Sequence, residues 1–97
     1  MRSKPIRYCD HLEKRLELRS IDRELPARII SQPERLFDDT VTGYRIAVSS
    51  TTYRGEEHLM MVVFQECEDE IIAITTHPLE MRDVETKMRS GRWKPWL

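Results

Sequence analysis

The first third of the chain carries hydrophobic residues with the period of an α-helix. The segment Tyr8–Arg19 contains no Gly or Pro and is rich in Leu, Glu, Lys and Arg, which favours a helix. Most of its charged residues fall on one side of a helical wheel, and its apolar residues fall on the other. The segment Ser20–Asp22 interrupts this pattern, and apolar residues at every fourth position then predict a second helix that ends at Ser31. Gln32-Pro33 stops that helix, because a residue before proline avoids the helical conformation.

After Pro33 the pattern changes to the alternation of β-strands. The expected strands are Arg35–Asp38, Tyr44–Arg54, Leu59–Phe64 and Ile71–Thr76. The third of these is apolar at every position, so we expect it at the centre of the sheet with both faces buried. The connections between the strands are short, which favours antiparallel neighbours in a meander.

A third helix is expected near the end of the chain. Pro78 suits its first turn, Val84 and Met88 belong to its apolar stripe, and Ser90-Gly91 ends it. The predicted fold class is therefore α+β: two N-terminal helices packed on a roughly four-stranded antiparallel meander sheet, with a C-terminal helix. We expect the helices to share one face of the sheet, and residues 1–97 to form a single domain.

Composition narrows the classes of protein. The 97 residues are 39% hydrophobic and 34% charged, and 16 basic side chains against 17 acidic ones give a net charge of −1. This balance and the strong apolar pattern argue against disorder. They also exclude a uniformly basic nucleic-acid-binding protein, so that a nucleic-acid site would have to be a local patch.

The charges are segregated along the chain. Residues 55–70 hold six acids and neither Lys nor Arg. Residues 81–97 hold five basic side chains and two acidic ones. The turns of the sheet are thus acidic and the C-terminal segment is basic, although a set of solvated surface charges would give the same pattern.

Cysteine and histidine spacing gives no indication of a disulfide framework or a metal site. Two cysteines, Cys9 and Cys67, are too few for a disulfide framework, and they lack the CxxC spacing of a zinc site. The histidines at positions 11, 58 and 77 lack the spacing of zinc ligands, and the scattered glycines form no phosphate loop, so we expect neither metal nor cofactor. The chain also lacks an apolar run of membrane-spanning length, and its first residues lack the apolar core of a signal sequence. We expect a cytoplasmic protein with no membrane partner.

His11 and Arg15 are the first candidates for chemistry. They stand one turn apart at the edge of the apolar side of the first helix, with Cβ atoms expected about 5–6 Å apart. An imidazole exchanges a proton near neutral pH, and a guanidinium holds a phosphate and offsets charge that develops on it. With Arg19 one turn further on, this trio suits RNA cleavage without a metal. The alternative is structural: His11 covers the edge of the core, and Arg15 pairs with a nearby carboxylate.

His77 is the second candidate, at the end of the last expected strand. Strict alternation would place it on the same face as Ile71, Ala73 and Thr75. A histidine at a strand end, just before a helix, lies at a sheet edge where sites are often assembled. The alternative is an exposed loop histidine.

Further basic residues are candidates for holding RNA. Arg45 lies on the face of its strand opposite Tyr44, and either lines an open sheet surface or is simply solvated. Arg92, Trp93 and Lys94 interleave basic side chains with an indole, which suits base stacking and phosphate contact. The alternative for Trp93 is that it packs back on the body of the protein.

Several sequence blocks together resemble a known family. The blocks are His11–Ile21, Ile30–Glu34, Ile72–His77 and Lys87–Trp93. In this order they resemble a family of small bacterial domains of unknown function, related to the BrnT and RelE ribonuclease toxins of the barnase/RelE-like fold group. The resemblance implies two N-terminal helices on a four-stranded antiparallel sheet with a C-terminal helix. It also implies metal-independent RNA cleavage, often held in check by a cognate antitoxin protein.

The leading hypothesis is therefore a toxin-like, metal-independent endoribonuclease. His11 would act as general base or acid, Arg15 and Arg19 as cations that stabilise the phosphate, and His77 as the second proton-transfer group. Arg45, Arg92 and Lys94, with the indole of Trp93, would hold the RNA. The alternative is a non-catalytic module that binds protein or RNA through its sheet face and aromatic tail, and a domain with degraded activity is a third reading.

Overall fold

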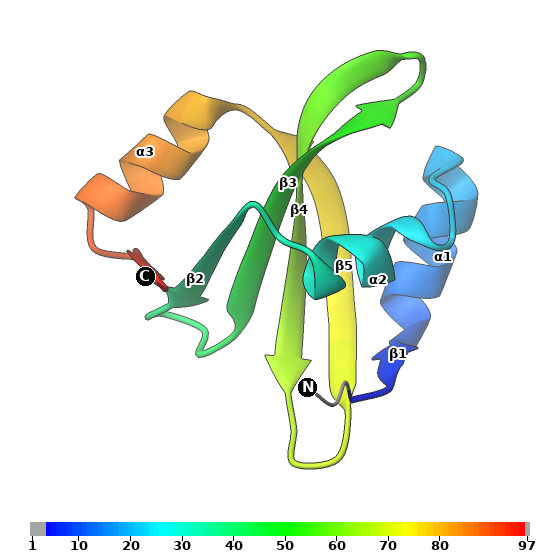
Figure 1. Ribbon diagram of the computed structural model, residues 1–97, viewed down its shortest axis with the longest axis horizontal. Helices are drawn as coiled ribbons and strands as arrows, with labels where there is room; N and C mark the ends of the chain where they lie inside the picture. Colours follow the sequence, from blue (N-terminus) through cyan, green and yellow to red (C-terminus); the bar gives the residue numbers. More distant parts are fainter. Residues whose placement is uncertain (1–3, 97) are drawn as a thin grey trace.

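The computed structural model describes residues 4–96; residues 1–3, part of the segment used to judge a signal sequence, and residue 97 lie outside it. The elements are β1 (Ile6–Tyr8), α1 (Asp10–Arg19), α2 (Leu25–Ser31), β2 (Arg35–Asp39), β3 (Arg45–Tyr53), β4 (Glu56–Glu66), β5 (Ile71–Leu79), α3 (Met81–Arg89) and β6 (Trp93–Pro95). Figure 1 shows the sheet with α1 and α2 on one side of the picture and α3 on the other. The chain is an α+β protein.

The sheet has six strands in the order β1-β5-β4-β3-β2-β6. Its central strands β2 to β5 are antiparallel neighbours in chain order, as the short connections predict. The sheet as a whole is larger and mixed, because β1 pairs in parallel with β5 and β6 pairs antiparallel with β2. The sequence pattern misses both outer strands, since three residues are too few to reveal a period of two.

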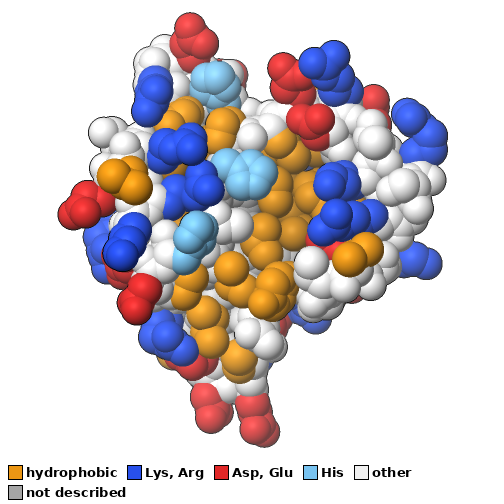
Figure 2. Space-filling view, turned by 180° about the vertical axis from the view of Figure 1, so that it is seen from behind, with side chains coloured by type: hydrophobic (Ala, Val, Ile, Leu, Met, Phe, Trp, Pro, Cys, Tyr) orange, Lys and Arg blue, Asp and Glu red, His pale blue; other side chains and the backbone are white. Residues whose placement is uncertain are grey.

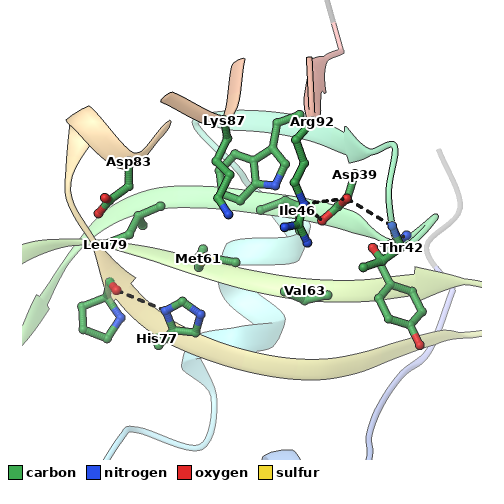
Figure 3. Close-up of a pocket in the computed structure, with 13 residues that line it drawn as sticks. Asp39, Thr42, Ile46, Met61, Val63, His77, Leu79, Asp83, Lys87 and Arg92 are labelled. Carbon is green, nitrogen blue, oxygen red and sulfur yellow. Dashed lines mark hydrogen bonds and ion pairs between the residues drawn. The ribbon is translucent and has the colours of Figure 1, made fainter. Parts of the chain in front are cut away.

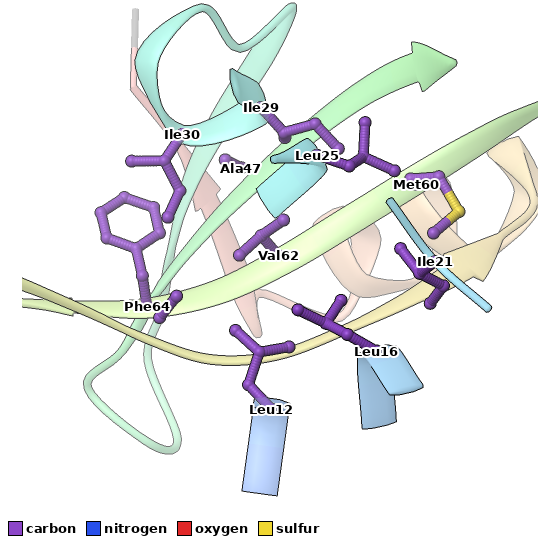
Figure 4. Packing of buried hydrophobic residues seen from close by; sticks show 11 residues of the cluster. Leu12, Leu16, Ile21, Leu25, Ile29, Ile30, Ala47, Met60, Val62 and Phe64 are labelled. Atoms are coloured by element: carbon purple, nitrogen blue, oxygen red, sulfur yellow. The ribbon is translucent and has the colours of Figure 1, made fainter. Parts of the chain in front are cut away.

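The helices cover both faces of the sheet, so the expectation that they share one face is wrong. Leu12 and Leu16 of α1 pack with residues of α2 on a cluster that includes Val62 and Phe64 (Figure 4). On the opposite face, Val84 of α3 belongs to a separate cluster with residues of β2, β3, β4 and β6. The physical reason lies in β3 and β4, whose consecutive apolar residues place hydrophobic side chains on both faces, and both faces need cover.

Two boundaries differ from the sequence prediction. Tyr8 belongs to β1, and α1 begins at Asp10. Pro78 lies inside β5 and does not open α3, which starts at Met81 behind a capping box made by Glu80 and Asp83. A proline is tolerated there because β1 pairs with β5 only as far as Ala73, which leaves the later part of β5 at the edge of the sheet.

Candidate functional site

A pocket of about 440 Å³ lies between α3 and the face of the sheet that α3 covers. Its floor is apolar and comes from Ile46, Met61 and Val63 of the central strands. Polar side chains surround this floor in Figure 3, with His77 on the side of β5 and with Lys87 and Arg92 on the opposite side. The pocket therefore combines an apolar floor with an imidazole, two cations and the two carboxylates of Asp39 and Asp83.

A β-bulge directs His77 into this pocket. Phe64 pairs with Ala73, but the preceding residue Val63 pairs with Thr75, so that Ile74 is an extra residue in β5. After this bulge His77 pairs with Met61 and shares its face of the sheet. The expectation that His77 shares a face of the sheet with Ala73 is thus wrong. The extra residue moves the side chains that follow it to the opposite faces.

One ring nitrogen of His77 lies beside a backbone carbonyl. Nδ1 lies 3.2 Å from the carbonyl oxygen of Pro78. A carbonyl can only accept, so this contact is a hydrogen bond when Nδ1 carries the proton. In that tautomer Nε2 keeps a lone pair and can take up a proton from another group.

A buried carboxylate fixes Arg92 at the far wall of the pocket. Nε of Arg92 donates to both carboxylate oxygens of Asp39, at 3.2 and 3.3 Å, and Asp39 is only 5% exposed. Burial raises the pKa of the Asp39 carboxyl, but hydrogen bonds from Arg92 and from the backbone N–H groups of Val41 and Thr42, with the charge of Arg92, outweigh burial and lower it. Among residues 4–96, the Nη atoms of Arg92 have no hydrogen-bond partner, so this side of the guanidinium can receive an anion.

Helix α1 brings Arg15 to the level of His77 beside the open edge of β5. The two elements run in the same direction, since β1 pairs in parallel with β5 and the N–H of Cys9 donates to the carbonyl of Ala73 at 3.1 Å (Figure 1). The thiol of Cys9 also contacts the carbonyl of Ile74. From Cys9 to Arg15 the helix rises about 9 Å, and from Ile74 to His77 the strand advances about 10 Å.

The side of α1 that carries Arg15 also faces away from α2. Glu13 lies on the other flank of the helix and forms an ion pair with Arg23, in the connection to α2. His11 and Arg15, one turn apart, therefore lie toward β5. Figure 2 shows histidine side chains together with Lys and Arg side chains along one margin of the open apolar face, and further Lys and Arg side chains across from them.

Arg15 has an unusual environment for a basic residue. Its Nε is buried and has no hydrogen-bond partner among residues 4–96. None of the carboxylates in that range forms an ion pair with Arg15 or with Lys87. Within that range, Arg15 therefore does not pair with a nearby acid, as the structural alternative expected. The other residue of the pair, His11, is exposed.

Other candidates lie away from the pocket. Arg45 pairs with Phe64, on the face that α1 and α2 cover, where it forms ion pairs with Glu66 and Asp38. Lys94 is opposite Asp38 in register and so lies on the same face as Arg45. Neither residue joins His77 in one site.

Trp93 and Arg19 have structural contacts. The indole of Trp93 is 3% exposed and packs on Phe37 with ring centroids 5.2 Å apart, so it forms a wall of the pocket and not an open stacking surface. Arg19 is exposed at the end of α1, and its carbonyl accepts hydrogen bonds from Tyr53 and Arg54. These bonds attach the end of α1 to the β3–β4 hairpin.

Sequence reasoning missed Lys87 and Asp39 as residues of the pocket. One indication was available for Lys87, which follows the buried Val84 by three positions and therefore lies beside the apolar stripe of α3. No comparable indication existed for Asp39, which was expected in an ordinary turn. Its role depends on Arg92, and only the pairing of β2 with β6 brings these residues together.

Within residues 4–96 no group of three His, Cys, Asp or Glu side chains is placed to hold a metal ion. In the same range, no helix has the length and apolar character needed to cross a membrane.

Comparisons of the chain with protein-family models, with curated proteins and with solved structures find no match. The resemblance to the ribonuclease toxins remains a prediction, and functional arguments depend on the site itself.

Proposed function

We propose that this protein is a toxin-like endoribonuclease that cleaves RNA without a metal ion, at the margin where α1 meets β5. One observation carries the proposal. His77 and Lys87 line one pocket, Arg15 lies on the neighbouring helix α1, and neither cation forms an ion pair with a carboxylate among residues 4–96. Cations that are left unpaired around an imidazole suit a phosphodiester substrate.

The proposed reaction uses these side chains as acid, base and phosphate-binding groups. A base removes the proton of a ribose 2′-hydroxyl, the 2′-oxygen forms a bond to the neighbouring phosphorus, and the bond from phosphorus to the 5′-oxygen breaks. An acid protonates the leaving 5′-oxygen, which gives a 2′,3′-cyclic phosphate and a free 5′-hydroxyl end. His77 performs one of the proton transfers and His11, from the same margin, the other. Arg15 stabilises the negative charge that develops on the phosphorane.

The charge distribution supports RNA as the substrate in spite of the net charge of −1. The acidic residues Glu68, Asp69 and Glu70 lie in or beside the β4–β5 turn, beyond the strands that form the floor of the pocket. The basic side chains at the margins of the open face supply the local patch that the composition requires (Figure 2).

The test is cleavage of a labelled single-stranded RNA in the presence of EDTA. We expect cleavage by the wild type, a loss of at least about 100-fold in His77→Ala, and a similar loss in Arg15→Ala. His58→Ala and Lys14→Ala are matched controls, because they remove a histidine outside the pocket and a neighbouring cation that is exposed on α1. Full cleavage by either of the first two variants would overturn the assignment.

The second candidate function is a non-catalytic module that binds RNA or a partner protein. The observation that favours it is that His77 is the one imidazole that lines the pocket among residues 4–96, while His11 lies at the margin. Binding of RNA with Arg15-dependent affinity, but without cleavage, supports this candidate. Induced expression in bacteria separates the toxin-like function further, since growth should stop with the wild type and continue with His77→Ala.

A further inference from the structure

We infer that the pocket under α3 binds one nucleotide of the RNA, with its base on the apolar floor and its phosphate at Lys87 and Arg92. This inference deepens the proposed function and rests on it, because the nucleotide in the pocket would be the neighbour of the phosphate that is cleaved at His77. It assigns a ligand to a pocket in which the sequence identified only His77, Arg92 and Trp93.

The floor suits a flat apolar ring. Ile46, Met61 and Val63 come from two paired strands, and Ile46 lies directly opposite Val63 in the register. Their side chains lie on one face of the sheet and line the bottom of the pocket (Figure 3). At about 440 Å³ the pocket is within the range of about 300–1,000 Å³ that is usual for sites that bind small molecules.

The cations define the position of the phosphate. Lys87 extends from α3 over the floor in Figure 3, and its ammonium group forms no ion pair among residues 4–96. Arg92 is held by Asp39 through Nε alone, which leaves its Nη donors to an incoming anion. Because the ion pair already holds the Arg92 side chain in place, the side chain loses little conformational entropy when it binds a phosphate.

Charge complementarity also excludes a purely apolar occupant. An apolar peptide side chain would fill the floor but would leave Lys87 without a counter-charge and the Nη donors of Arg92 without an acceptor. Inorganic phosphate would satisfy the cations but would leave the apolar floor open to water. A nucleoside monophosphate satisfies both parts, so it should bind more tightly than either of its halves.

The experiment measures binding of 5′-AMP, adenosine and inorganic phosphate to the uncleaved protein. In a Trp96→Phe background the fluorescence of Trp93, which lines the pocket, reports occupancy. We expect 5′-AMP to bind at least about tenfold more tightly than adenosine or phosphate. Lys87→Ala should weaken 5′-AMP binding about tenfold or more, and Lys87→Arg should restore most of it. Lys94→Ala is the matched control, since it removes a lysine from the other face of the sheet.

The outcomes separate this inference from the proposed function. Binding of 5′-AMP that depends on Lys87, in a protein that cleaves no RNA, supports the nucleotide pocket and refutes the ribonuclease. RNA cleavage that depends on His77, with no binding of 5′-AMP or with equal binding in Lys87→Ala, refutes the pocket alone. Tighter binding of adenosine or of phosphate than of 5′-AMP also overturns the inference.

Discussion

Ala73 and His77 are four positions apart on β5, yet their side chains lie on opposite faces of the sheet. Ala73 belongs to the core under α1 and α2, whereas His77 lines the pocket under α3. The extra residue at Ile74 causes this reversal, because the register shifts between Val63 and Phe64 of the partner strand. A single bulge therefore decides whether the imidazole is available for chemistry.

The ion pair between Asp39 and Arg92 should contribute to stability in a pH-dependent way. We expect Asp39→Asn to lower the free energy of unfolding by about 1–3 kcal/mol at pH 7, because Arg92 loses a charged partner in a buried setting. The pKa of the Asp39 carboxyl is lowered in the folded state from its ordinary value of 3.8. Its contribution is therefore complete above that value and is lost as the pH falls through the depressed pKa.

Urea denaturation at several pH values measures this effect. The difference between wild type and Asp39→Asn should be largest near neutral pH and should shrink as the pH falls below 3.8. Asp38→Asn is the control, because Asp38 is exposed and its ion pair with Arg45 is longer, at 3.6 Å, and therefore weak. A difference that stays constant down to acidic pH contradicts the assigned role of the carboxylate.

Ser20→Gly should stabilise the protein. Ser20 ends α1 in the left-handed conformation, with φ of 54°, which costs energy in a residue with a Cβ atom. We expect the free energy of unfolding to rise by about 0.5–1 kcal/mol. Ser31→Gly, at the last position of α2, should instead be destabilising by up to about 1 kcal/mol, and equal effects of both changes would refute the argument.

Leu12→Ala tests the attachment of α1 to the sheet. Leu12 is completely buried, so its truncation should lower the free energy of unfolding by about 2–5 kcal/mol through lost burial and a cavity. Leu18→Ala is the same substitution on the same helix at a side chain that is 81% exposed, and it should change stability by less than about 0.5 kcal/mol. Thermal or urea unfolding of the two variants makes the comparison.

The salt dependence of RNA binding tests the two unpaired cations separately. A 2′-O-methyl RNA lacks the attacking hydroxyl and should bind without being cleaved. For this ligand, Lys87→Ala and Arg15→Ala should each make the slope of log K against log salt less negative by about 0.7, as expected for the loss of one phosphate contact. Lys14→Ala and Lys94→Ala should leave the slope unchanged, and an equal change in all four variants would point to non-specific attraction.

Local patterns predicted the main elements well, because the energetic reasons are local. The break at Ser20, the end of α2 before Pro33 and the buried centre of β4 all follow from backbone conformation or from consecutive apolar residues. Pro78 was misplaced because its usual preference for a first helical turn was outweighed by its position in the unpaired edge of β5.

The site could be predicted only in part, because it is assembled from distant segments. The i,i+4 spacing of His11 and Arg15 is visible in the sequence, and so is the imidazole at the end of β5. The face that His77 occupies depends on a bulge, and the orientation of Arg92 depends on the pairing of β2 with β6. Neither has a local signature in the chain.

Both cations of the pocket, Lys87 and Arg92, come from residues that follow β5. During translation the sheet from β1 to β5 can therefore emerge from the ribosome before the pocket under α3 is complete. A nascent chain of this kind would not yet present the complete pocket, so any function of the pocket would begin only after α3 and β6 have docked.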